Sequence, residues 1–384
     1  MAFGVYVHIP YCIKKCPYCD FNSHGVGDDF PEDKYTQSLL KEVELSSGYY
    51  NETLSTIFIG GGTPSLFGIE NIEEIINSIL KNFSCSSDLE ITLELNPKTV
   101  TLEKLKGFKS IGINRLSAGI QSFKQSKLNF LGRLNTPEDG RAVLNDIYKA
   151  GFSNFNFDLI CGCSNETMED WRLELEEVKN FNNSHVSVYC LTIETGTDFA
   201  RLYKKGALRL PSDEIIGEIL NYTGEYLYDL GFEQYEISNF AREGYECKHN
   251  LLYWENKDYL GFGAGAHSHI SKTNGADWGL RWSNIKNPES YMNMVYRNKP
   301  PVISRHNLNR IEALEEKVLM GLRLNRGINL EYIEKSFDVK LNLGNIDYLL
   351  HDDYLKFLNT NLSITDRGRL FTNEIILRVL DSFV

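Results

Sequence analysis

Short apolar runs alternate with amphipathic stretches along the first two-thirds of the chain, a pattern typical of parallel strands joined by helical crossovers. Most runs are rich in β-branched or aromatic residues, which favour strands. The six predicted strands are Gly4 to Ile9, Ser55 to Ile59, Leu89 to Leu95, Arg115 to Ile120, Asn154 to Ile160 and His185 to Tyr189. The pattern therefore predicts a barrel-like α/β fold with fewer units than the eight of a full barrel.

Amphipathic stretches predict the helices that connect these strands. They include Tyr35 to Leu45, Ile69 to Phe83 and a closing helix from about Asp213 to Leu230. Thr136 and Pro137 predict a helix start, because threonine is a good N-cap and proline suits the first helical position.

The pattern changes after Phe232, becoming aromatic and irregular, and turns helical again from about Asn309. We therefore expect a barrel at 1–232, a linking segment at 233–308 and a smaller, mainly helical domain at 309–384. Its predicted elements are helices at Ile311 to Leu324, Leu330 to Phe337, Asn345 to His351 and Asn373 to Leu380, and a small hairpin built from Leu355, Leu362 and Arg369 with the residues after each. This resembles a winged-helix unit, but its mixed charges favour a docking or lid role over DNA binding.

Composition narrows the function classes. The 384 residues include 40 basic and 52 acidic ones, a formal charge of −12, so we expect no nucleic-acid partner and at most peripheral membrane contact. The N-terminus shows no export-signal pattern, and no apolar run reaches the length of a membrane span. These features predict a cytoplasmic protein.

Three cysteines lie close together just after the first predicted strand, at Cys12, Cys16 and Cys19. A cubane iron-sulfur cluster normally takes four cysteine ligands, so a loop with three would leave one iron open. A zinc site with His24 as fourth ligand is the competing interpretation. A disulfide is disfavoured in a reducing compartment.

Glycine and polar residues follow the predicted strands, where barrels of this type carry their functional groups. Gly60 to Pro64 forms a glycine-rich turn after the second strand. The third strand ends with Glu94 to Pro97, the fourth ends at Gln121 with Arg133 twelve residues later, and the fifth carries Asp158. Carboxylates, an amide and a guanidinium at one rim could bind an amino-acid head group and a ribose.

The cysteine spacing, with Tyr18 before the last cysteine, resembles the radical S-adenosylmethionine (SAM) enzymes. The framing residues His8 to Cys12 and Cys19 to Ser23 resemble one branch of them, which contains oxygen-independent coproporphyrinogen oxidases and related haem chaperones. The resemblance implies a partial, six-stranded barrel that holds a [4Fe-4S] cluster on Cys12, Cys16 and Cys19. It also implies SAM contacts at Tyr6, Tyr18, Gly61, Gly62, Thr63, Glu94, Gln121, Arg133, Asp158 and Thr192.

One family block departs from the usual pattern. Cys161-Gly-Cys163-Ser stands where these enzymes usually have Tyr-Gly-Leu-Pro, although Asp158 is kept. By themselves, most of the cysteines outside the loop are expected to be small buried residues, with a second metal or redox role at Cys161 and Cys163 as the lesser alternative.

Two features separate the branches. The oxidases carry a fourth cysteine where this chain has Phe21, and a long N-terminal arm where only eleven residues precede Cys12. His249-Asn-x-x-Tyr-Trp254 resembles the haem-binding motif of the chaperones, with Cys247 as an alternative thiolate ligand. From the residues alone, a satisfied histidine in an aromatic cluster is the favoured reading of His249. His267 and His269 are expected to be structural.

The resemblance therefore implies a haem chaperone that binds haem and delivers it to acceptor haemoproteins. The alternative is an oxygen-independent coproporphyrinogen III oxidase, which acts on propionate side chains in porphyrin biosynthesis. A structural zinc protein is the third class.

Overall fold

The computed structural model describes residues 2–27, 29–46, 50, 52–273 and 275–384. Twelve strands form one sheet in the order β14-β13-β12-β11-β1-β4-β5-β6-β7-β8-β10-β9. Its centre consists of six neighbouring parallel strands. They are β1 (Ala2–Ile9), β4 (Thr53–Gly61), β5 (Cys85–Leu95), β6 (Arg115–Gln121), β7 (Phe155–Cys161) and β8 (His185–Cys190). The predicted six-stranded partial barrel is confirmed.

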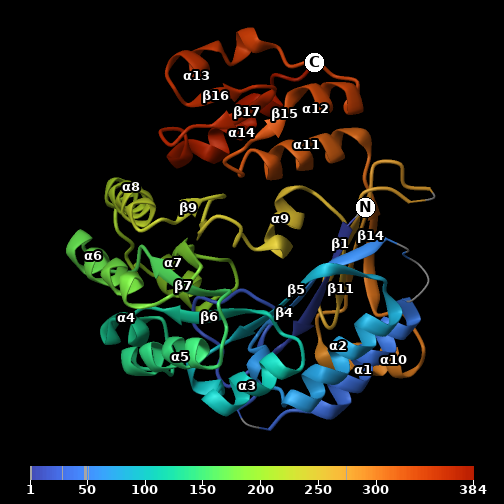
Figure 1. Ribbon diagram of the computed structural model, residues 1–384. Helices are drawn as coiled ribbons and strands as arrows, with labels where there is room; N and C mark the ends of the chain where they lie inside the picture. Colours follow the sequence, from blue (N-terminus) through green and yellow to red (C-terminus); the bar gives the residue numbers. More distant parts are fainter. Residues whose placement is uncertain (1, 28, 47–49, 51, 274) are drawn as a thin grey trace.

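Helices pack along the outside of this curved sheet (Figure 1). They are α1 (Glu32–Ser46), α2 (Ile69–Asn82), α3 (Leu102–Ser110), α4 (Gln125–Phe130), α5 (Pro137–Lys149), α6 (Met168–Glu176), α7 (Asp198–Lys204) and α8 (Asp213–Asp229). Helix α2 buries isoleucines at helical spacing, at 72, 75, 76 and 79. Helix α5 starts as predicted, with Pro137 in its first turn and a capping box between Thr136 and Asp139.

Residues 233–308, which we expected to link two domains, add strands to both ends of the same sheet. At one end β11 (Tyr259–Phe262) runs parallel to β1, and antiparallel strands β12 (His267–Ile270), β13 (Leu280–Asn284) and β14 (Val302–Asn307) follow. At the other end β10 (Asn239–Ala241) and β9 (Glu233–Gln234) pair next to β8. The segment also forms α9 (Lys248–Trp254) and α10 (Pro288–Tyr296). The boundary at residue 232 stays a prediction.

The C-terminal residues form a lobe above the barrel (Figure 1). It contains α11 (Arg310–Gly321), β15 (Ile328–Asn329), α12 (Leu330–Phe337), α13 (Asp347–His351), β16 (Leu355–Leu358), β17 (Asn361–Ile364) and α14 (Thr372–Leu380). Its core, which includes Val318, Ile333 and Leu362, is separate from that of the barrel. The hairpin is β16 and β17 alone, because Arg369–Phe371, which we had placed with it, forms a 3-10 turn before α14.

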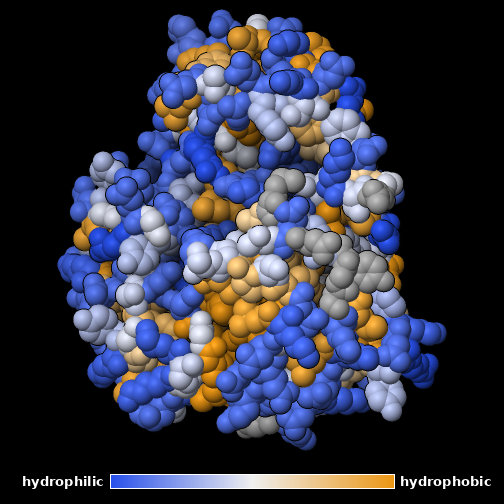
Figure 2. Space-filling model, turned by 45° about the vertical axis from the view of Figure 1, so that its right-hand side comes forward, coloured by the Kyte–Doolittle hydropathy of each residue, from blue (hydrophilic) through white to orange (hydrophobic). Residues whose placement is uncertain are grey.

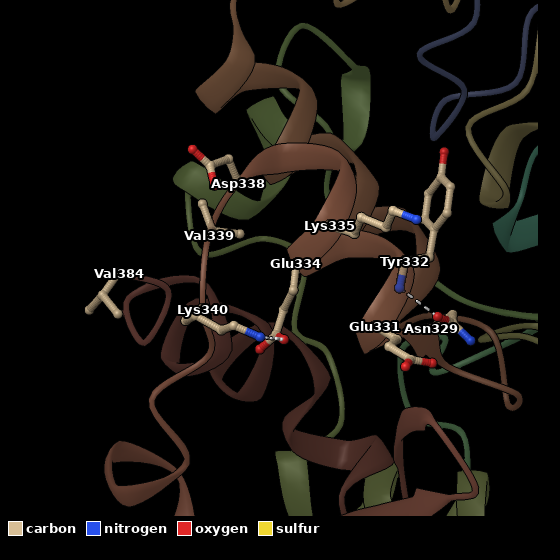
Figure 3. A pocket seen from close by; sticks show the side chains of 9 residues that line it. All are labelled: Asn329, Glu331, Tyr332, Glu334, Lys335, Asp338, Val339, Lys340 and Val384. Carbon is tan, nitrogen blue, oxygen red and sulfur yellow. Dashed lines mark hydrogen bonds and ion pairs between the residues drawn. The ribbon is translucent and has the colours of Figure 1, made fainter.

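The C-terminal lobe has a surface pocket of its own. A pocket of about 710 Å³ lies between α12 and Val384, where Lys340 pairs with Glu334 (Figure 3). Seen from another side, hydrophilic side chains dominate the lobe, and hydrophobic ones gather low on the body of the molecule (Figure 2).

Within the described residues, none of the helices combines the length and apolar character needed to cross a membrane.

Candidate cluster and SAM site

The cysteine loop begins where β1 ends and is closed by backbone hydrogen bonds. Within it β2 (Tyr11–Cys12) pairs with β3 (His24–Gly25), and the His24 N–H donates to the Pro10 carbonyl at 2.7 Å. The Cys19 N–H donates to the Cys16 carbonyl at 3.2 Å, which tightens the turn between those two cysteines. Cys12 is buried, and Cys16 and Cys19 are half-buried. The loop therefore holds its three thiols at the end of the barrel's first strand.

The three thiols lie near enough to influence one another electrostatically. Burial raises the pKa of the Cys12 thiol to about 11, and the proximity of Cys19 and then Cys16 contributes further. Thiolates are metal ligands, so binding iron would stabilise the charged forms that burial disfavours. Within the described residues, no three His, Cys, Asp or Glu side chains are grouped as around a single metal ion. The case for a cluster rests on the loop's spacing and its position at a cavity.

A cavity of about 310 Å³ opens beside the loop, at the carboxyl ends of the parallel strands. Because parallel strands end at the same edge, residues far apart in sequence meet there. The predicted residues that line it are Cys12, Cys16, Tyr18, Cys19, Gly61, Gly62, Thr63, Glu94, Gln121, Arg133, Asp158 and Thr192. The structure therefore brings together all of the predicted site except Tyr6 and His249.

The glycine turn after β4 lies against the cysteine loop. Gly61 has a φ of +115°, which favours glycine, and a Cβ on Gly62 would lie only 2.5 Å from the Tyr11 carbonyl oxygen. The Gly62 N–H donates to the Ile9 carbonyl at 2.7 Å, directly before the cysteine loop. Glycine is therefore required at this turn for close backbone packing against the cysteine loop.

Two half-buried carboxyl groups, Glu94 and Asp158, line this cavity. Burial raises the pKa of Glu94 to about 7, with a further contribution from Asp158, and burial also raises the pKa of Asp158. The Gly61 N–H donates to Glu94 at 3.0 Å, and the Asn156 amide donates to Asp158 at 2.7 Å. Two neighbouring carboxyls, each half-buried, favour a ligand that is cationic or rich in hydrogen-bond donors.

Arg133 is held in place by a residue that the sequence analysis did not assign. Its guanidinium donates to the Asn96 side-chain oxygen and to the Gly119 carbonyl, each at 2.6 Å, and Asn96 donates to the Thr63 hydroxyl at 2.9 Å. Asn96 therefore connects two predicted SAM contacts, Arg133 and Thr63. Its position directly after β5, at the carboxyl end of a parallel strand, could have indicated a role in the site. Gln121 has a φ of 69°, a strained conformation often found at functional sites.

Tyr6 lies outside this cavity and lines a neighbouring one of about 880 Å³. Its hydroxyl is hydrogen-bonded to Nδ1 of His8 at 2.9 Å. Tyr6 would therefore act on the cluster region only indirectly. It is hydrogen-bonded to His8, and the ring of His8 lies against Gly61 in the glycine turn.

His249 is buried in the barrel, with 1% of its surface exposed. Its Nδ1 is hydrogen-bonded to the Thr56 hydroxyl at 2.7 Å and its Nε2 to the Tyr253 hydroxyl at 2.8 Å. The ring stacks on Phe58, and burial lowers its pKa to about 3. Both ring nitrogens have partners, as expected for the satisfied histidine of the alternative interpretation, and the haem-ligand role of His249 stays a prediction.

The remaining cysteines differ in their surroundings. Cys161, Cys163 and Cys247 are buried, whereas Cys85 is exposed. Cys161 is the register partner of Cys190 on the neighbouring strand, and Cys190 lines the 310 Å³ cavity. Cys247 is 0% exposed with its thiol 3.8 Å from Glu90, so it does not face either cavity as an alternative haem ligand.

Comparison with known proteins agrees with this architecture. Residues 6–178 match the Radical SAM superfamily, and residues 308–371 match the HemN C-terminal domain. The solved structure of coproporphyrinogen III oxidase (HemN) from Escherichia coli, a radical SAM enzyme, superposes with a TM-score of 0.82 at 25% identity, covering 98% of this chain and 89% of that one. Fold and site thus define a radical SAM protein with a HemN-type C-terminal domain.

Curated relatives place the chain more closely. It is 36% identical to the heme chaperone HemW of Haemophilus influenzae, over 97% of this chain and 96% of that protein. It is 34% identical to the heme chaperone HemW of Bacillus subtilis, over 97% of each. The chain belongs to the HemW family of radical SAM proteins.

Proposed function

We propose that this protein is a cytoplasmic haem chaperone that carries a [4Fe-4S] cluster and SAM, binds haem and delivers it to acceptor haemoproteins. One observation carries the proposal: the cysteine loop, two half-buried carboxyls and Arg133 line a single cavity, in a chain related over nearly its full length to HemW proteins. The net charge of −12 supports partners other than nucleic acid.

Each residue at the cavity then has a distinct task. Cys12, Cys16 and Cys19 would bind three irons and leave the fourth open to the amino and carboxylate groups of SAM. The glycine turn and Thr63 would hold the amino group, while Arg133 would reach the carboxylate and Asp158 the ribose. Cluster and SAM together supply one-electron radical chemistry when bound, and the protein orients the ligand and excludes water.

SAM binding is expected to tighten as the pH rises through about 7. The half-buried Glu94 carboxyl has a pKa raised to about 7, so it is mostly protonated at pH 6 and mostly ionised at pH 7.5, where it attracts a cationic ligand. The change in ionised fraction predicts roughly five- to tenfold tighter binding at the higher pH. Calorimetric titration of the anaerobically reconstituted protein with SAM measures this.

Glu94→Gln is the matched control, since its amide keeps the shape without titrating. The variant should bind SAM more weakly and with little dependence on pH over this range. Equal pH dependence in the variant and the parent protein would show that another group titrates, and we would withdraw the role of Glu94.

A coproporphyrinogen III oxidase is the second candidate, favoured by the structural match to HemN. The position of Phe21 distinguishes the two. The oxidases carry a fourth cysteine there, whereas the exposed Phe21 ring lines both the 310 Å³ and the 880 Å³ cavity. An aromatic side chain between them suits a porphyrin held by stacking.

Two assays on the cluster-loaded protein separate these functions. We expect titration with haem to give a saturable Soret shift, and the loaded protein to pass haem to apomyoglobin, with no conversion of coproporphyrinogen III under anaerobic reducing conditions. Decarboxylation of coproporphyrinogen without haem binding would favour the oxidase and contradict the chaperone.

A further inference from the structure

The 880 Å³ cavity adjoins the SAM cavity and has the features of a site for a large planar ligand. Both cavities share Phe21, Gly61, Glu94 and Tyr189. Aromatic residues and one methionine form much of the larger cavity's wall: Tyr6, Phe21, Tyr189, Tyr253, Trp254, Tyr259 and Met320. Its volume lies within the usual range for pockets that bury a ligand of this class.

Two histidines line this cavity, and only one of them has free ring nitrogens. His8 is engaged on both sides, with Nδ1 2.9 Å from the Tyr6 hydroxyl and Nε2 2.8 Å from the Asn22 carbonyl. His267 is exposed on the wall, and its ring makes no hydrogen bond or ion pair within the described part of the chain. A haem iron needs an available imidazole nitrogen, which His267 offers and His8 does not.

The backbone of His267 is fixed although its ring is free. It begins β12 and pairs in antiparallel register with Ser283 of β13. Gly261 of β11 packs tightly against it, since a Cβ there would lie 2.1 Å from the His267 carbonyl oxygen. The imidazole is thus held at the start of a strand that pairs on both sides, as a preorganised ligand requires.

The charges around His267 favour a neutral ring and an anionic ligand. Partial burial of the ring and the neighbouring cations Lys286 and Arg281 lower the pKa of His267, which favours the neutral, metal-binding form. Arg281 is already paired with Glu316 at 2.6 Å. Lys286 and Arg323 also line the cavity, with Glu94 and Glu236, and neither cation forms an ion pair within the described residues. Arg323 donates one hydrogen bond to Asn373 at 2.9 Å and keeps other N–H groups, so both cations can face carboxylates of a ligand.

We propose that His267 is the axial ligand of haem bound in the 880 Å³ cavity, with Lys286 and Arg323 facing the two propionates. This inference rests on the proposed haem-binding function and assigns its site. It also explains how haem can lie beside the cluster, since the two cavities share their wall.

The test compares His267→Ala with a matched control, His351→Ala, which removes an exposed histidine of the C-terminal domain. Titration with ferric haem should show a shifted Soret band in His267→Ala only, together with an affinity for haem that is lower by more than about tenfold. Removing even a residue that only supports a metal ligand lowers metal affinity by about tenfold or more, so removing the ligand itself should lower it further. Added imidazole should restore the parent spectrum to His267→Ala, because the pocket is kept. Equal melting curves would show that the fold is intact.

The outcomes separate the inference from the function on which it rests. Absence of haem binding by the parent protein would overturn the proposed function. Normal binding by the parent with an unchanged Soret band and affinity in His267→Ala would overturn the ligand assignment alone. Lys286→Ala should weaken the binding of haem but not of haem dimethyl ester, and it should not move the Soret band. An equal loss of affinity for both ligands would contradict the contact between Lys286 and a propionate.

Discussion

Replacing Cys12, Cys16 or Cys19 by alanine is expected to abolish assembly of the iron-sulfur cluster. Each thiolate would bind a different iron of one cubane, so the loss of one cannot be compensated by the others. Anaerobic reconstitution should therefore give about four irons and four sulfides per parent chain and close to none in each variant. Iron and sulfide analysis with the visible charge-transfer absorption measures the loss, and SAM binding through the open iron should be lost with it.

Cys161→Ala and Cys163→Ala are the matched controls for this experiment. Both thiols are buried, and Cys161 faces Cys190 of β8 rather than the loop. Their replacement should leave the iron content unchanged, and a loss of iron would show that this cysteine group takes part in metal binding. One zinc per chain in place of the cluster would instead establish the zinc alternative.

The central fold could be predicted because its signals are local. Each parallel strand is a short apolar run, and the capping residues Thr136 and Asp139 act within a single turn. Helix α12 (Leu330–Phe337) has the predicted bounds, since its apolar spacing is complete within eight residues. The strands β9 to β14 could not be predicted in the same way. Several contain two to four residues, and their pairing with β1 and β8 is decided by contacts distant in sequence.

The candidate site was predictable where position along a strand decides function. Glu94 and Gln121 lie at the ends of parallel strands and Asp158 lies within the neighbouring strand β7, so the fold class alone predicts that they lie near one another. The roles of His249 and His267 depend on which partners the folded chain supplies. Thr56 and Tyr253 satisfy His249, whereas no partner among the described residues satisfies the ring of His267, and the local motif around His249 does not reveal this difference.

Glu94 lines both cavities. Its carboxyl accepts from the glycine turn that lies against the cysteine loop, and it also borders the larger cavity. A ligand in either cavity would change the electrostatic surroundings of this half-buried group. We therefore expect haem and SAM to influence each other's binding through Glu94, in proportion to how strongly each favours its ionised form.

His249→Ala is expected to destabilise the protein strongly while leaving the haem spectrum unchanged. The substitution leaves the Thr56 and Tyr253 hydroxyls without their partner inside the barrel and opens a cavity beside Phe58. The combined loss should be about 3 kcal/mol or more in the free energy of unfolding. Denaturant unfolding measures this loss, and a Soret titration of the same preparation measures haem binding.

His249→Gln is the control, because its amide can both donate and accept a hydrogen bond and should recover part of the stability. The pH dependence of the free energy of unfolding provides a second test of the buried, neutral state of His249. Burial lowers the pKa of His249 from 6.5 to about 3, so the folded protein keeps the ring neutral while the unfolded chain takes up a proton below pH 6.5. Its contribution to stability is complete above pH 6.5 and falls as the pH is lowered towards 3, a loss that both variants should lack. If His249→Ala instead moved the Soret band with little loss of stability, the ring would have to leave Thr56 and Tyr253 to bind iron, and His249 would replace His267 as the ligand.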